Sequence, residues 1–245
     1  MPETKKSDKD IIADLLSNIP IAEETVVKLP SGNRFYKLTD PSKPITIRPI
    51  DFKDEKAIYS SEPGADVINL LLSRCVSNLP IGQLLLVDKL SLIFKLRELS
   101  YGDDYGVIIN CNSCSKDNKV QFELSKLAVT EVPKDLSNPC DIHLPTLGKD
   151  AKVRLPRIED EEYLYSPEVT AKNMWRFITD IDGNTRKGII SAVAENLPIK
   201  DAHMVLKVLS GEGLGVNTKV KFSCSYCSNS DIVDLPITTD FFTGN

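Results

Sequence analysis

The chain has 245 residues, of which 41% are apolar and 27% are charged, and its formal net charge is −5. This composition indicates a globular, soluble chain with enough residues for one large domain or two small ones, and no apolar run approaches the length of a membrane span. Because the charge is negative and no long basic block occurs, the composition disfavours a protein that follows nucleic-acid phosphates.

The N-terminal residues differ in composition from the rest of the chain. The first ten are charged and contain no signal-peptide core, so we expect the chain to stay in a reducing cytosol. Residues 1–23 are predicted to form a flexible N-terminal arm. Within it, residues 11–16 are amphipathic and form either a helix that orders on a partner or part of a mobile tail.

After the arm, the pattern predicts strands and then helices. Residues 25–29 lead into a Pro-Ser-Gly-Asn turn, after which Phe35 and Tyr36 are predicted to return as the second strand of a hairpin. Residues 45–50 alternate as a further strand. Helices are predicted over 66–76 and 82–99, and the second should be central in the core because it is apolar over much of its circumference.

The second half of the chain repeats this change from strands to helices. Residues 126–158 are predicted to be β, with strands over 141–144 and 151–155. A helix is predicted from Pro167 to about Ile181, carrying the only tryptophan, Trp175, and further helices over 185–195 and 199–210. The acidic run 159–162 is interpreted as a solvated face, with a contact patch for a basic partner as the second interpretation.

Two Cys-x-x-Cys pairs are the most informative motif. Cys111 with Cys114, and Cys224 with Cys227, each lie between a predicted strand and its return strand. Four thiolates on two such knuckles suit a tetrahedral ion, which predicts one structural Zn²⁺ per chain. Two reduced thiol pairs, or two half-sites completed by another chain, are the alternatives.

Other chemistry is disfavoured by the same residues. A redox Cys-x-x-Cys needs a helix N-terminus, and a four-thiolate zinc site leaves no position for a reacting water. Cys75 and Cys140 are interpreted as core or incidental thiols, while His143 and His203 lack a nucleophile partner. We therefore predict a protein that is not an enzyme and takes no small-molecule substrate.

An internal duplication is suggested by a repeated Asn-Leu-Pro-Ile segment, at residues 78–81 and 196–199. Each copy follows a predicted helix and precedes another helix and a cysteine knuckle. The resulting fold class is α+β, with antiparallel hairpins and two related helix–helix–knuckle halves joined at a Cys₄ zinc site. In this interpretation residues 24–245 form one zinc-stapled domain, with halves at about 64–127 and 167–242 and a β-rich insert at about 128–160.

Several segments, taken in order, resemble the baseplate-hub proteins of T-even-like contractile-tailed bacteriophages. They are residues 29–32, 47–49 and 84–88, the run 96–102 before the first knuckle, and the closing segment from Phe177 through the second knuckle to Phe241-Phe242. The resemblance covers most of residues 25–242. It implies an assembly component of the tail baseplate, made in the host cytoplasm and built into the virion, and it implies no catalytic residue.

The prediction is therefore a structural baseplate subunit that acts through protein–protein contacts. Its expected partners are other baseplate and tail proteins, with copies of the chain itself as an option, and neither a membrane nor nucleic acid. Residues 11–16 and Phe241-Phe242 could insert into such neighbours, or the two phenylalanines could pack on the chain's own core. The alternative function is a zinc-ribbon nucleic-acid or transcription-associated module, supported by Lys116, Lys119, Lys219 and Lys221.

Overall fold

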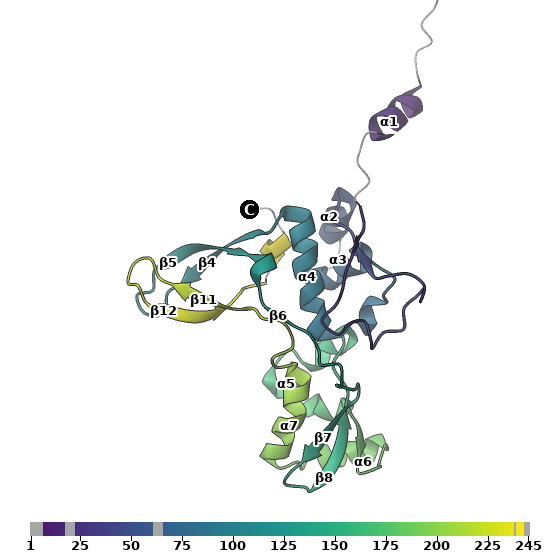
Figure 1. The fold of residues 1–245 in the computed structure, drawn as a ribbon, viewed down its shortest axis with the longest axis vertical. Coiled ribbons are helices and arrows are strands. Elements are labelled where there is room, and N and C mark those ends of the chain that lie inside the picture. The colour runs from purple at the N-terminus through teal and green to yellow at the C-terminus, as the bar shows by residue number, and fades with distance from the viewer. Residues whose placement is uncertain (1–6, 18–22, 61–65, 238, 243–245) are drawn as a thin grey trace, which may run out of the picture.

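Buried apolar side chains form two large cores and one small cluster of Leu85, Cys140 and Leu155. The ribbon in Figure 1 shows how the elements of the fold are arranged. The computed structural model describes residues 7–17, 23–60, 66–237 and 239–242. The first core is built from residues between 27 and 124 and between 216 and 242, and the second core from residues between 144 and 209. The chain is thus a mixed α+β protein with antiparallel strands, as predicted.

Helix α4 (Leu86–Tyr101) runs through the first core, as its apolar pattern predicts (Figure 1). The sequence predicts that this helix starts at Gly82. It starts at Leu86 instead, because Ile81–Gln83 form a separate 3₁₀ turn and Leu85 is extended. It ends at Gly102, whose φ of +91° is readily adopted only by glycine. Its buried apolar side chains are Leu92, Ile93, Phe94 and Leu96.

A small three-stranded sheet lies in the first core, and the predicted hairpin over residues 25–36 is wrong. Strand β1 (Thr25–Val26) pairs with β2 (Thr46–Ile47), which also pairs with β3 (Val76–Ser77). Tyr36 is not in a strand, because its hydroxyl donates to the buried carboxylate of Asp88 and accepts from the Leu85 N–H. These hydrogen bonds hold Tyr36 against the start of α4, so the residues after the Pro-Ser-Gly-Asn turn do not pair with β1.

Helices α2 (Phe52–Tyr59) and α3 (Val67–Cys75) complete the first core, and α3 agrees with its predicted range. The arm contributes α1 (Asp8–Ser17), on which the side chains of Ile11, Ile12 and Leu15 are exposed. Residues 1–6 and 18–22 of the predicted arm lie outside the described residues, so its flexibility stays a prediction. None of the helices in the described ranges is long and apolar enough to cross a membrane.

The second core combines a sheet with helices. Its strands are β7 (Cys140–Leu144), β8 (Lys149–Val153) and β9 (Ile178–Ile181), in the order β7-β8-β9. Its helices are α5 (Pro167–Asn173), α6 (Lys187–Ala194) and α7 (Ile199–Ser210). Helix α5 ends at Asn173 and a 3₁₀ turn follows over Met174–Arg176. The predicted helix from Pro167 to Ile181 is wrong from Ile178, because Ile178 and Ile181 are buried in a strand that pairs with β8.

One short ladder joins the parts of the chain on either side of the second core. Strand β6 (Val129–Thr130) pairs with β10 (Gly215–Val216). At Gly215, where φ is +74°, an added Cβ would lie 2.6 Å from the carbonyl oxygen of Val87 in α4. Glycine at this position lets the chain leave the second core close against the central helix.

Two hairpins extend from the first core and carry the cysteine knuckles (Figure 1). They are β4 (Asp104–Asn110) with β5 (Asp117–Glu123), and β11 (Lys219–Ser223) with β12 (Ser230–Asp234), as predicted. Leu79 of the first Asn-Leu-Pro-Ile segment packs in the first core, whereas Leu197 of the second packs against the second core. The two-half architecture stays a prediction.

Phe241 and Phe242 pack into the first core, which resolves the two possibilities that their sequence leaves open. The ring of Phe241 is fully buried and makes edge contacts with Phe94, Tyr105 and Phe242 at centroid distances of 5.4, 4.7 and 5.2 Å. The segment Phe241-Phe242 is therefore part of the protein's own core.

We expect Phe241→Ala to lower the free energy of unfolding by about 3–5 kcal/mol, since it removes a buried ring and leaves a cavity. Urea unfolding measures the loss. The matched control is Phe52→Ala, because that ring is 67% exposed and its removal should cost less than about 0.5 kcal/mol. Equal losses from the two variants would contradict the packing of the C-terminal segment.

Candidate metal centre

The two knuckles have the same local geometry. In each, the N–H of the first cysteine donates to a carbonyl five residues on: Cys111 to Lys116 at 3.0 Å and Cys224 to Asn229 at 2.9 Å. The carbonyl of that cysteine accepts from the residue after the second cysteine, Ser115 at 2.8 Å or Ser228 at 2.9 Å. Each knuckle therefore closes on itself at the end of its hairpin.

Folding brings the four predicted cysteines together. Their sulfur atoms all lie within 4.8 Å of one another. Two distances link the knuckles: Cys111 Sγ to Cys227 Sγ and Cys114 Sγ to Cys224 Sγ are both 3.7 Å. In a regular tetrahedron with Zn–S bonds of about 2.3 Å, neighbouring sulfurs are about 3.8 Å apart. The two distances between the knuckles therefore match those of a tetrahedral tetrathiolate ion.

The centre lies at the edge of the first core. Cys111 and Cys224 are buried, Cys114 is half-buried and Cys227 is exposed. The first cysteine of each knuckle thus faces the packed hairpins, and the second faces outward. Four sulfur ligands would fill a tetrahedral coordination shell, so the arrangement suits a structural ion and provides no vacant position for a substrate.

Asn118 supports the centre from β5, and the cysteine pattern alone does not identify it. Its Nδ2 donates to Cys224 Sγ at 3.5 Å and to the Lys116 carbonyl at 2.9 Å. Its Oδ1 accepts from the N–H and hydroxyl of Ser225 at 2.9 and 2.8 Å. The alternation of side chains along β5 could have identified it. Asn118 takes an inward position of this strand, and a polar residue at such a position needs a polar partner.

The protonation of the cluster is uneven. Burial opposes ionisation of Cys224, but hydrogen bonds from the Tyr226 and Cys227 N–H groups and from Asn118 together lower the pKa of its thiol to about 6. The Lys116 N–H favours a thiolate at Cys114, yet burial and the neighbouring cysteines raise the pKa of that thiol to about 12. Without a cation, four close thiols cannot all ionise, whereas Zn²⁺ would displace the protons.

Two further contacts hold the knuckles together. Asn112 Nδ2 of the first knuckle donates to Asp231 Oδ2 of the second hairpin at 2.9 Å. The ammonium of Lys116 lies 4.7 Å from the ring centre of Tyr226. Both are exposed contacts that add little stability by themselves, so a firm attachment of the two knuckles would depend on an ion bound by the four sulfurs.

The remaining cysteines and histidines lie outside the cluster. Burial and the nearby Asp54 carboxylate raise the pKa of Cys75 to about 12, so it stays a thiol. Cys140 donates its S–H to the Ser137 carbonyl at 3.2 Å. His143 bonds Asp150 at 2.7 Å, and His203 is exposed on α7. These placements agree with the core or incidental roles predicted for them.

The acidic run 159–162 is not wholly a solvated face, so that interpretation is wrong. Asp160 is buried and accepts two hydrogen bonds from the Arg154 guanidinium, at 2.6 and 2.7 Å. Glu161 pairs with Lys89 of α4 at 2.7 Å. The run therefore joins the second core to the central helix.

Ser115 and Ser228 adopt the left-handed region, with φ of +55° and +59°. Because a side chain is strained there, we expect Ser115→Gly or Ser228→Gly to raise the free energy of unfolding by about 0.5–1 kcal/mol with no loss of metal. Ser113→Gly in the same knuckle is the control, since its φ is not positive and it should be neutral or destabilising. Thermal melting of the metal-loaded protein measures the difference, and a gain only at Ser113 would contradict the strain.

Comparison with known proteins agrees with the resemblance seen in the sequence. No curated protein and no solved structure matches the chain. A family model described as T4 bacteriophage base plate protein matches residues 21–243, which include both cores and all four cysteines of the centre. Since the match covers most of the chain, this protein belongs to the T4 bacteriophage base plate protein family.

Proposed function

We propose that the chain is a structural subunit of the hub, or central region, of a phage tail baseplate, and that it acts through protein–protein contacts during assembly of the contractile tail. The observation that carries the proposal is the family match over residues 21–243. The subunit would be made in the host cytoplasm and built into the virion.

The proposed role of the centre is that of a structural staple with one Zn²⁺ per chain. The 3.7 Å sulfur distances and the support from Asn118 favour this role. A thiolate set of this kind suits zinc better than the hard cations that prefer oxygen ligands. We further propose that the protein works without catalysis, because four sulfur ligands leave no open coordination position.

The nucleic-acid alternative finds less support. Lys116, Lys119, Lys219 and Lys221 are exposed near the knuckles. They share the hairpins with exposed Asp117 and Asp234, and Lys219 lies opposite Asp234 in the β11–β12 register. Because acidic side chains interrupt the lysines, the hairpins offer no continuous positive track for phosphates.

The test is a phage in which the gene is interrupted by a nonsense codon. We expect the non-permissive host to accumulate incomplete baseplates, visible by electron microscopy, and the wild-type gene supplied in trans to restore tails. Mass spectrometry of purified baseplates and of assembly intermediates then shows where the protein resides. Normal tails without the protein would overturn the proposal, and salt-sensitive binding to DNA or RNA at physiological ionic strength would favour the alternative.

A further inference from the structure

The second core carries a polar hollow of about 420 Å³ on the side formed by α6, β9 and the 3₁₀ turn Met174–Arg176. Its walls combine aromatic and cationic side chains. Tyr163, Trp175, Arg176, Thr179, Lys187 and Ile190 line it. Tryptophan, tyrosine and arginine are the residue types that dominate binding energy at protein interfaces.

Arg176 is held in place before any ligand binds. Its guanidinium lies 4.4 Å from the ring centre of Tyr163 and 4.8 Å from that of Trp175. Its Nε donates to Asn173 Oδ1 at 3.0 Å. An arginine fixed in this way loses little conformational entropy when it binds a carboxylate through its remaining N–H groups.

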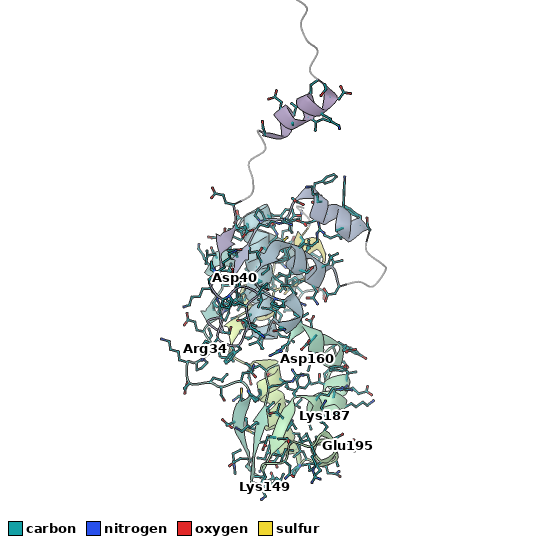
Figure 2. All side chains as sticks on the ribbon, turned by 90° about the vertical axis from the view of Figure 1, so that its right-hand side faces the viewer. Arg34, Asp40, Lys149, Asp160, Lys187 and Glu195 are labelled. Atoms are coloured by element: carbon teal, nitrogen blue, oxygen red, sulfur yellow. The ribbon has the colours of Figure 1, made fainter. Side chains whose placement is uncertain are left out.

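Within the described part of the chain, two of the three cations that line the hollow have no acidic partner. Arg154 and Asp160 neutralise each other as a close pair at its wall. Among the described residues, neither Arg176 nor Lys187 has a carboxylate within ion-pair distance. Figure 2 marks Asp160 and Lys187 on the second-core half of the molecule. On a chain with a net charge of −5, these free cations select an anionic partner.

Helix α1 has the complementary surface. Its sequence carries three aspartates and one lysine, so it is acidic. Ile11, Ile12 and Leu15 form one face and are 43%, 55% and 67% exposed, and Asp8 lies on that face one turn earlier. A helix of ten residues is marginal alone in water, so α1 gains stability from a surface that covers these side chains.

We propose that the hollow around Trp175 and Arg176 binds helix α1 of a second copy of the chain. Carboxylates of α1 bind Arg176 and Lys187, and the aliphatic face of α1 packs on Trp175 and Tyr163. The partner is a second copy because α1 lies beyond the first core, on the side away from the second core that carries the hollow (Figure 1). This inference deepens the proposed function, on which it rests, by naming a partner and a contact.

Carboxylate recognition fits the hollow better than nucleic-acid recognition. Single-stranded nucleic acid needs open aromatic faces for base stacking and a row of cations along its backbone. Here only Arg176 and Lys187 are available as cations, and two cations make no row along which a nucleic-acid backbone could lie. A head-to-tail contact of the proposed kind joins different surfaces of the two copies, so it extends to a ring or a longer array.

The test is sedimentation of the full metal-loaded chain from low to high micromolar concentration. We expect reversible self-association and a concentration-dependent change in the fluorescence of Trp175, which is the only tryptophan and therefore reports on the hollow. Arg176→Glu with Lys187→Glu should weaken association at least about tenfold, because like charges then face each other. Lys200→Glu, an exposed charge reversal on α7 of the same core, is the control and should have no effect.

A charge swap makes the assignment specific. Asp8→Lys with Asp14→Lys should also weaken association, and an equal mixture of this chain with the Arg176→Glu, Lys187→Glu chain should restore it. If the reversed pair lowers the melting temperature, Arg176→Gln with Lys187→Gln replaces it. A wild-type chain that stays monomeric, variants that associate normally, or a mixture that does not recover each overturns the inference.

The contact between copies can be distinguished from nucleic-acid binding and from the proposed function itself. A change in Trp175 fluorescence on adding a single-stranded oligonucleotide, with no self-association, would assign the hollow to nucleic acid and overturn the inference. A chain found in baseplates that is nevertheless monomeric would refute this contact alone. A self-associating chain that is absent from tails and dispensable for them would refute the proposed function and leave the contact standing.

Discussion

Cys114→Ser and Cys227→Ser are each expected to abolish zinc binding and to lower the free energy of unfolding by at least about 3 kcal/mol. Binding of a structural zinc contributes on the order of 10 kcal/mol, and a neutral serine hydroxyl does not replace a thiolate ligand. The two knuckles otherwise share few contacts, chiefly those of Asn118 and Asn112. Zinc content by mass spectrometry and urea unfolding measure the two effects.

The controls for this prediction separate metal loss from thiol loss. Cys140→Ser should keep the zinc, because Cys140 lies in β7 and its thiol bonds the Ser137 carbonyl. A chelator should destabilise the wild-type protein as much as the serine variants and have no further effect on them. Protein purified without metal, in which all four knuckle thiols react with an alkylating agent while folded, would refute a structural zinc centre.

The position of the centre explains why its loss should affect more than the hairpins. The first knuckle precedes the second core in the chain and the second knuckle follows it, so an ion at the sulfurs closes a loop around that core. Closing a long loop restricts the unfolded chain, and the effect grows slowly with loop length. We therefore infer that an ion bound there would also stabilise the junction at which β6 pairs with β10.

The four clustered cysteines and their hairpins could be predicted because their signals are local. Cys-x-x-Cys in a tight turn places two sulfurs on one side whatever surrounds it, and the flanking strands alternate with period two. Helices α3, α6 and α7 were also predictable, since each carries its own apolar stripe. Such features need no information about distant parts of the chain.

The features that were missed depend on distant contacts. Tyr36 leaves the expected hairpin because Asp88, 52 residues away, binds its hydroxyl. Residues 178–181 become β9 because β8 offers them an edge. Asn118 gains its role only when the second knuckle presents Ser225 and Cys224 to it. Local propensity is a weak guide where tertiary contacts satisfy the backbone and the polar groups.

Asp54→Asn is expected to lower the free energy of unfolding by about 3 kcal/mol, because it leaves two arginines without their shared carboxylate. Asp54 is fully buried and accepts from Arg48 and Arg74, each at 2.7 Å, and from the N–H of Asp51, at 3.0 Å. The arginine side chains are 26% and 36% exposed, which places the cost at the low end for a buried pair. Asp40→Asn is the control, since its carboxylate is 43% exposed and its replacement should change the free energy of unfolding much less than Asp54→Asn.

The pH dependence of this cost follows from the direction of the pKa shift. Burial alone would raise the pKa of Asp54, but Arg48, the Asp51 N–H and Arg74 together hold it well below its ordinary range. A carboxyl with a depressed pKa stabilises the fold above its unfolded pKa of about 3.9, and this contribution is lost as the pH falls toward its folded pKa. The difference between wild type and Asp54→Asn in urea unfolding should therefore be constant near neutral pH and shrink below about pH 4. Acid also removes zinc from thiolates, but it does so in both proteins, so the difference isolates Asp54.

A difference that is below about 1 kcal/mol at neutral pH, or that grows on acidification, would show that the carboxylate does not hold α2 to the first core through these arginines.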